Sequence, residues 1–61
     1  MADSREILAA ESVDELRRRV DAWYADSAGR GLTEVREPWD AARVKTTESG
    51  FVEFEVWASG S

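Results

Sequence analysis

The sequence contains no cysteine and no histidine. Without cysteine there can be no disulfide bond and no thiolate metal site to supplement a small core. Without histidine, a single chain cannot form imidazole zinc sites, histidine-activated nucleophiles or histidine pH switches. Long apolar runs are missing too, since no stretch approaches the roughly 20 residues of a membrane-spanning helix. These absences exclude many catalytic, metal-binding and membrane functions.

Basic residues are scarce as well: eight Lys and Arg stand against 13 Asp and Glu, for a net charge of −5. This charge opposes docking on nucleic acid or on an anionic membrane, so we expect neither as a partner. The polar N-terminus is unlike a signal peptide, and we therefore expect a cytoplasmic protein. The 61 residues suffice for a single domain, residues 1–61, in which 1–4 and 58–61 are expected to be frayed tails.

The run from 42 to 57 predicts a β-hairpin with a defined register. A two-residue loop at 49–50 would place charged side chains opposite apolar ones. A three-residue loop at 48–50 separates the two kinds of side chain and also puts Gly50 where the turn needs a positive φ. The resulting pairs are Thr46 with Val52, Val44 with Phe54 and Ala42 with Val56 on one face, and Lys45 with Glu53 and Arg43 with Glu55 on the other.

A capping box marks the start of a helix. The Ser12 hydroxyl can accept from the Glu15 amide, and the Glu15 carboxylate can reach back to the Ser12 amide. Apolar residues then recur at helical spacing up to Trp23, and two glycines follow at 29 and 31. We expect a helix from about Val13 to Ser27.

Short apolar segments at 5–10 and 32–37 predict two further strands, and Pro38 ends the second because proline cannot continue a ladder. The element order predicts an α+β fold, a two-layer βαββ(β) arrangement with one helix packed on one face of a small, mainly antiparallel sheet. The apolar side of the hairpin would face the helix. The pattern leaves open whether the first strand lies beside the second or the fourth.

One helix can cover only one side of such a sheet, so the other side would display charged residues with Phe51 and Trp57. These aromatics could anchor self-association, or could simply lie over the stems of their charged neighbours. Trp39 could plug one end of the core or anchor a partner. We predict a homodimer or higher oligomer with the following candidate interface: Trp39, Arg43, Lys45, Phe51, Glu53, Glu55 and Trp57.

Catalysis is not expected. Glu53 and Glu55 would lie about 7 Å apart on one strand face, a spacing compatible with two-carboxylate hydrolysis. Each has a cationic residue opposite it in the predicted register, so structural pairing explains both. The chain has no calcium loop and no glycine-rich phosphate loop. We therefore predict no catalytic, cofactor-binding or metal residues and no cofactor.

The stretch Ile7–Leu16, with Val20 and a glycine-led strand at Gly31, resembles small uncharacterised bacterial and phage proteins. In those proteins an apolar strand runs into a Ser-x-x-Glu-Leu helix, followed by a strand and a closing hairpin. Leu32 stands where they have tryptophan. The resemblance implies a fold and a phage or bacterial setting, and it brings no catalytic residues.

Two functions compete. The first is a non-catalytic interaction module that self-associates and presents its aromatic and charged sheet face to an unidentified protein. The second is an acidic inhibitor of the phage type, whose carboxylates mimic nucleic acid and block a host protein. Acidic residues gathered on one surface, away from Arg17–Arg19, would favour mimicry, whereas alternating signs would favour the module. The acidic residues concerned are Asp14, Asp21, Asp26, Glu34, Glu37 and Glu48.

Overall fold

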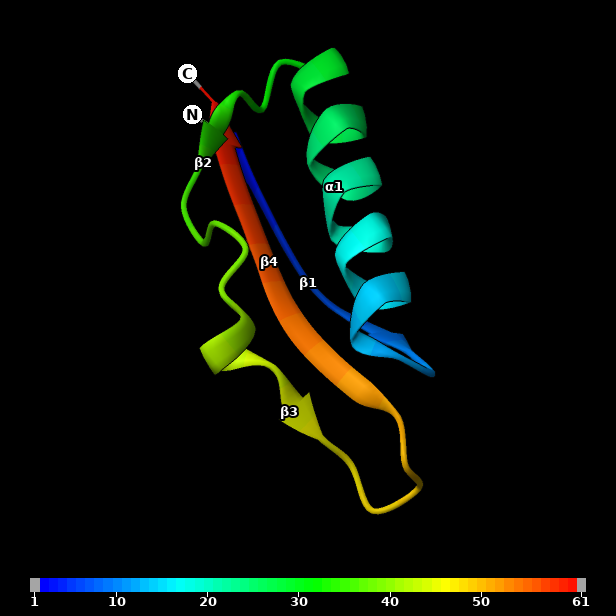
Figure 1. Cartoon of the computed structure of the whole chain (residues 1–61). Coiled ribbons are helices and arrows are strands. Elements are labelled where there is room, and N and C mark those ends of the chain that lie inside the picture. The colour runs from blue at the N-terminus through cyan, green and yellow to red at the C-terminus, as the bar shows by residue number, and fades with distance from the viewer. Residues whose placement is uncertain (1, 61) are drawn as a thin grey trace.

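A computed structural model describes residues 2–60, in which one helix packs on one face of a small antiparallel sheet (Figure 1). The predicted α+β fold class is confirmed. In chain order the elements are β1 (Ala2–Ala10), α1 (Val13–Gly29), β2 (Glu34–Val35), a 3₁₀ turn (Ala41–Arg43), β3 (Lys45–Thr46) and β4 (Val52–Gly60).

β4 is the central strand of the sheet. β1 pairs with it antiparallel along its whole length, from Ala2 opposite Gly60 to Ala10 opposite Val52. β2 and β3 both lie along the other edge of β4, at its two ends, β2 opposite residues 58 and 59 and β3 opposite residues 52 and 53. The first strand therefore lies beside the fourth. β2 and β3 act as one edge strand that residues 36–44 interrupt.

The prediction of frayed tails at 1–4 and 58–61 is wrong for residues 2–4 and 58–60. These residues pair with one another in β1 and β4, and β2 adds a further partner for Ser59. Ala58 is fully buried, and Gly60 lies against the backbone of Gly31. The two ends are ordered because each supplies the other's hydrogen-bonding partner. Met1 and Ser61 lie outside the described residues.

The helix begins where the sequence indicates, at the Ser12 cap, whose Oγ accepts from the Glu15 amide at 3.2 Å. The second half of the predicted capping box does not form. The Glu15 carboxylate instead accepts from the guanidinium of Arg19, one turn further on, at 3.0 Å. This ion pair competes for the carboxylate because residues four apart lie side by side on a helix.

The helix ends two residues later than predicted, in a Schellman motif. The Leu32 amide donates to the Ser27 carbonyl at 2.8 Å, and the Gly31 amide donates to the Ala28 carbonyl at 3.1 Å. Gly31 has a φ of +91°, which glycine adopts without steric cost. The motif turns the chain back toward the sheet, where β2 begins at Glu34.

The predicted hairpin register and loop are confirmed. Lys45 lies opposite Glu53 and Thr46 opposite Val52. The Thr47 amide donates to the Phe51 carbonyl at 2.8 Å, which closes the loop at residues 48–50. Gly50 has a φ of +89°.

Before Lys45, however, the predicted pairing is wrong, because residues 41–43 form a 3₁₀ turn instead of a strand. The Asp40 carboxylate caps this turn by accepting from the Ala42 amide at 3.0 Å. The predicted pairs of Ala42, Arg43 and Val44 with Val56, Glu55 and Phe54 are therefore missing from the ladder. Val44 still packs against the core as a half-buried side chain.

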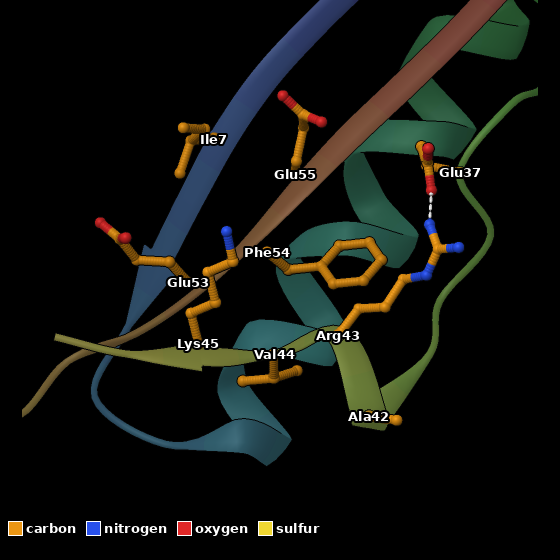
Figure 2. A pocket seen from close by; sticks show the side chains of 9 residues that line it. All are labelled: Ile7, Glu37, Ala42, Arg43, Val44, Lys45, Glu53, Phe54 and Glu55. Carbon is orange, nitrogen blue, oxygen red and sulfur yellow. Dashed lines mark hydrogen bonds and ion pairs between the residues drawn. The ribbon is translucent and has the colours of Figure 1, made fainter.

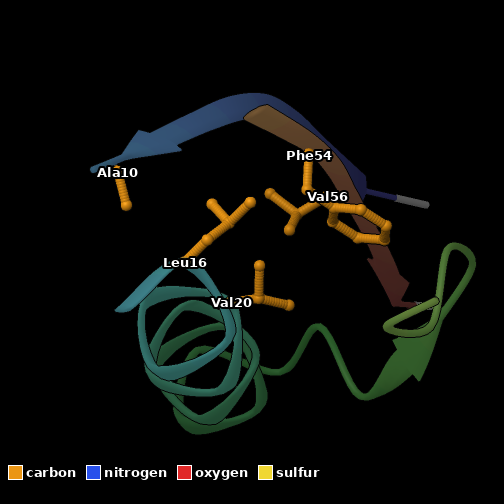
Figure 3. Packing of buried hydrophobic residues seen from close by; sticks show 5 residues of the cluster. All are labelled: Ala10, Leu16, Val20, Phe54 and Val56. Carbon is orange, nitrogen blue, oxygen red and sulfur yellow. The ribbon is translucent and has the colours of Figure 1, made fainter. Parts of the chain in front are cut away.

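The core lies between α1 and the sheet, where Leu16 and Val20 of the helix meet Ala10, Phe54 and Val56 of the strands (Figure 3). All are at most 3% exposed. Even-numbered positions of β1 and β4 thus face the helix, and odd-numbered positions face away. Trp39 packs on Phe54 with ring centroids 5.1 Å apart, so it plugs the core from the interrupted edge.

Candidate functional site

The side of the sheet opposite α1 has no covering element in the described part of the chain, and we refer to it as the open face. Most of its side chains are charged. Among its uncharged side chains Ile7 is a large apolar one that is 62% exposed. The open face consists of Asp3, Arg5, Ile7 and Ala9 from β1, Glu53, Glu55 and Trp57 from β4, and Lys45 from β3.

Trp57 is held rigidly on the open face by its neighbours. The guanidinium carbon of Arg5, its direct cross-strand partner, lies 4.0 Å from the ring centroid, and that of Arg36 lies 5.2 Å away. The indole nitrogen donates to the Asp3 carboxylate at 3.3 Å. Cations over an indole ring are attracted by its negative face. The indole is therefore half-buried between two arginines, and its orientation is fixed before any partner arrives.

A shallow cavity of about 400 Å³ lies beside the open face, where residues 36–44 leave β4 (Figure 2). The Trp57 carbonyl accepts from the Arg36 amide at 2.8 Å, so its backbone polar groups point toward the interrupted edge. By alternation, those of Glu55 point into the cavity, where neither β2 nor β3 reaches them. The lining residues are Ile7, Glu37, Ala42, Arg43, Val44, Lys45, Glu53, Phe54 and Glu55.

Tyr24 of α1 joins the interrupted edge to β4 at Glu37, one of the residues that line this cavity. Its hydroxyl donates to the Glu37 carbonyl and accepts from the Trp57 amide at 3.3 Å. The Arg36 and Glu37 amides both donate to the Trp57 carbonyl, at 2.8 and 3.4 Å, so two residues face one as in a β-bulge. The tyrosine hydroxyl thus replaces the ladder hydrogen bonds that end at this bulge.

The surroundings of Tyr24 change its acidity. Burial raises the pKa of its hydroxyl above the ordinary value, and the negative charge of Glu37 raises it further, while the hydrogen bond from the Trp57 backbone acts in the opposite direction. The hydroxyl stays protonated and can serve as a donor throughout the neutral range. Tyr24 was not among the residues expected to be functional, although a tyrosine beside an apolar helical stripe brings a hydroxyl that requires a partner when buried.

The predicted candidate interface is split by the structure. Lys45, Glu53, Glu55 and Trp57 share the open face, and Phe51, just before β4, is 42% exposed. Arg43 lies at the rim of the cavity, whereas Trp39 lies on the opposite side, against the core.

The predicted ion pairs across the hairpin also differ. Arg43 bonds with the Glu37 carboxylate, and its Nε lies 3.9 Å from Asp40, so it does not pair with Glu55. Lys45 and Glu53 are register partners, but no ion pair joins them within residues 2–60.

Sequence reasoning missed Ile7, Arg5 and Arg36. Their roles depend on the neighbours of Trp57 and Glu55, and the sequence pattern did not decide which strands those neighbours come from. Once β1 is known to lie beside β4, alternation alone places Arg5 opposite Trp57 and Ile7 opposite Glu55 on the open face.

Other kinds of site find little support between Ala2 and Gly60. No group of three or more Asp and Glu side chains there is arranged to hold a metal ion. No helix in this range has the length and apolar character needed to cross a membrane. Comparisons with protein-family models, with curated proteins and with solved structures gave no match.

Proposed function

We propose that this chain is a small, non-catalytic protein-interaction module that self-associates through the open face of its sheet. The observation that carries the proposal is the bare second side of the sheet, on which Ile7 is 62% exposed. A single exposed apolar side chain is ordinary on a protein surface. Here it lies between a preoriented indole and a cavity, which together form a continuous surface rather than an isolated residue.

The charges of the open face suit a second copy of the same face. Arg5 and Lys45 are basic, and Asp3, Glu53 and Glu55 are acidic, so both signs are present on this surface. In a symmetric dimer the same patch meets itself, and a patch with both signs can place each charge near an opposite one.

The competing hypothesis, mimicry of nucleic acid, loses support from local ion pairing. It requires carboxylates that stand free of cations on one surface. Asp26 pairs with Arg30 at 3.3 Å, and Glu34 pairs with Arg36 at 2.9 Å. Glu37 bonds with Arg43 in the same way. Three of the six carboxylates named for mimicry are thus paired with a cation, which supports the interaction module. Asp14, Asp21 and Glu48 take part in no ion pair within residues 2–60.

Sedimentation velocity across a concentration series tests the proposal. We expect the apparent mass to rise above the 6.8 kDa of one chain as concentration increases. A species that keeps the monomer mass at every concentration would contradict self-association.

A matched pair of variants then tests the surface. Ile7→Thr keeps the β-branched shape but removes apolar contact from the open face, and we expect it to weaken association. Val35→Thr makes a similar change at a side chain 46% exposed, on the helix side of the sheet, because Val35 lies opposite Ala58. It should leave association unchanged. Equal effects of the two variants would exclude the open face.

A further inference from the structure

The outer edge of β1 carries backbone groups that the fold does not use. Odd-numbered residues of β4 direct their amides and carbonyls toward β2, as the bond from Arg36 to the Trp57 carbonyl shows. Even-numbered residues of β4 therefore bond with β1, whose even-numbered residues lie opposite them. It follows that the amides and carbonyls of Asp3, Arg5, Ile7 and Ala9 point outward, away from the sheet.

The helix provides a hydrogen-bond donor at only one end of this edge. The outward carbonyl of Ala9 accepts from the Arg19 guanidinium at 3.1 Å, which independently confirms the direction of the odd-numbered groups. For Asp3, Arg5 and Ile7, no hydrogen bond to these outward backbone groups is found within residues 2–60. An unpaired strand edge of this kind is a template for another strand.

We propose that the outer edge of β1 pairs antiparallel with β1 of a second copy, with Asp3 opposite Arg5 of that copy. By symmetry, Arg5 then lies opposite Asp3 of the second copy, and Ser4 lies opposite Ser4. The two sheets become one, both helices lie on one side, and the two open faces join on the other. The inference rests on the proposed self-association and moves the contact from the open face to the strand edge that borders it, so that the two joined open faces stay exposed in this dimer.

Charge selects this register among those that bring outward groups together. The proposed register is centred on Ser4. A register centred on Arg5 sets Arg5 against Arg5, and one centred on Asp3 sets Asp3 against Asp3. A register centred on Glu6 opposes two carboxylates. Like charges directly opposite one another destabilise a strand pair.

The register centred on Ile7 fails for a different reason. It would place Arg5 of the second copy opposite Ala9, where the Arg19 guanidinium already occupies the carbonyl. Two guanidinium groups would then meet at one position. A register centred on Leu8 would pair Ile7 with Ala9 and needs the same occupied carbonyl. The register in which Asp3 and Arg5 pair twice avoids that carbonyl and has opposite charges at both hydrogen-bonded positions.

Arg5 and Asp3 both keep hydrogen-bonding groups that are free for this contact. Arg5 stacks over Trp57, which leaves the N–H groups at the rim of the guanidinium plane free to donate. Neither Arg5 nor Asp3 takes part in an ion pair between Ala2 and Gly60. Asp3 accepts from the Trp57 indole through one oxygen, so its other oxygen can accept from a second copy.

Charge reversal in two separate chains tests the register. In Asp3→Lys, lysine meets arginine at both positions, and in Arg5→Glu, aspartate meets glutamate at both. We expect each variant alone to self-associate at least about tenfold more weakly than the wild type. An equimolar mixture restores two opposite pairs, so a heterodimer should form with near wild-type affinity in sedimentation velocity. Far-ultraviolet circular dichroism of each variant checks that it is folded.

Milder substitutions serve as controls. Arg5→Gln and Arg36→Gln each remove one cation from Trp57, but only Arg5 lies on the β1 edge. Only Arg5→Gln should weaken association, and Asp3→Asn should weaken it similarly. This neutral set keeps the test valid if a charge reversal prevents folding.

The outcomes separate this inference from the proposed function. A wild type that remains a monomer contradicts both. A wild type that associates while the Asp3 and Arg5 variants associate equally well, or fail to complement one another when mixed, overturns the β1 edge and leaves the open face as the contact surface.

Discussion

Removal of the Tyr24 hydroxyl should measure how strongly the interrupted edge is held to the sheet. Tyr24→Phe keeps the ring, with its edge contact to Trp23 at 5.2 Å, and deletes only the oxygen. The Trp57 amide and the Glu37 carbonyl both lose their partner. Leaving a buried polar group unsatisfied costs about 1–3 kcal/mol.

The site is only partly buried, which allows water to reach it and puts each loss at the low end of that range. We therefore expect a total of about 2 kcal/mol for the two groups. A chain of this length has a free energy of unfolding of about 3–9 kcal/mol, so the loss is a large fraction of the whole. Urea denaturation followed by tryptophan fluorescence would measure it at neutral pH.

The pH dependence provides a second readout. Because burial raises the pKa of Tyr24 in the folded state, the hydroxyl contributes stability that is fully present below the unfolded-state pKa of about 10. This contribution is lost as pH rises through the folded-state pKa. The stability difference between wild type and Tyr24→Phe should therefore narrow above about pH 10. Tyr24 is the single tyrosine, so its ultraviolet absorbance titrates it directly.

Two results would refute this reasoning. A Tyr24→Phe variant as stable as the wild type at neutral pH would show that the hydroxyl bridge contributes nothing. A tyrosine that titrates at its ordinary pKa in the folded protein would show that the hydroxyl is in water.

Three substitutions test other parts of the fold by urea denaturation. Gly60→Ala should destabilise by about 1–3 kcal/mol, because a Cβ would clash with the Gly31 carbonyl oxygen. Gly29→Ala, where a Cβ meets nothing within 4 Å, is the control and should be neutral or stabilising, and a harmless Gly60→Ala would contradict the close approach. Ser27→Ala should stabilise by about 1 kcal/mol, because the fully buried Ser27 hydroxyl has no hydrogen-bond partner within residues 2–60, and a loss of stability would reveal one. Gly50→Val should lower the free energy of unfolding by more than about 1 kcal/mol, because a φ of +89° strains a β-branched residue. A neutral result would contradict the positive φ at this position of the loop.

The elements that could be predicted are those encoded by neighbouring residues. The Ser12 cap, the glycines after the helix and the alternation from Lys45 to Glu53 each depend on contacts over a few positions, and the structure agrees with them. The hairpin register is a strong case, because a shift by one residue would exchange the two faces.

The candidate site depended instead on contacts between distant residues. Arg43 was expected to continue β3, yet the Asp40 cap and the Glu37 carboxylate hold it in a turn. The alternation of apolar and polar residues predicts a strand here, but it does not show that a side-chain cap will favour a turn instead. The contacts of Trp57 could not be predicted from the sequence either, because they join Arg5 of β1 to a strand 52 residues further along the chain.

The central position of β4 has a consequence for the order of folding. Every strand pair in the described sheet includes β4. β1, β2 and β3 therefore have no strand to join until residues 52–60 are in place. The β1–β4 pair joins residues from the two ends of the described range, and such distant closures are slow.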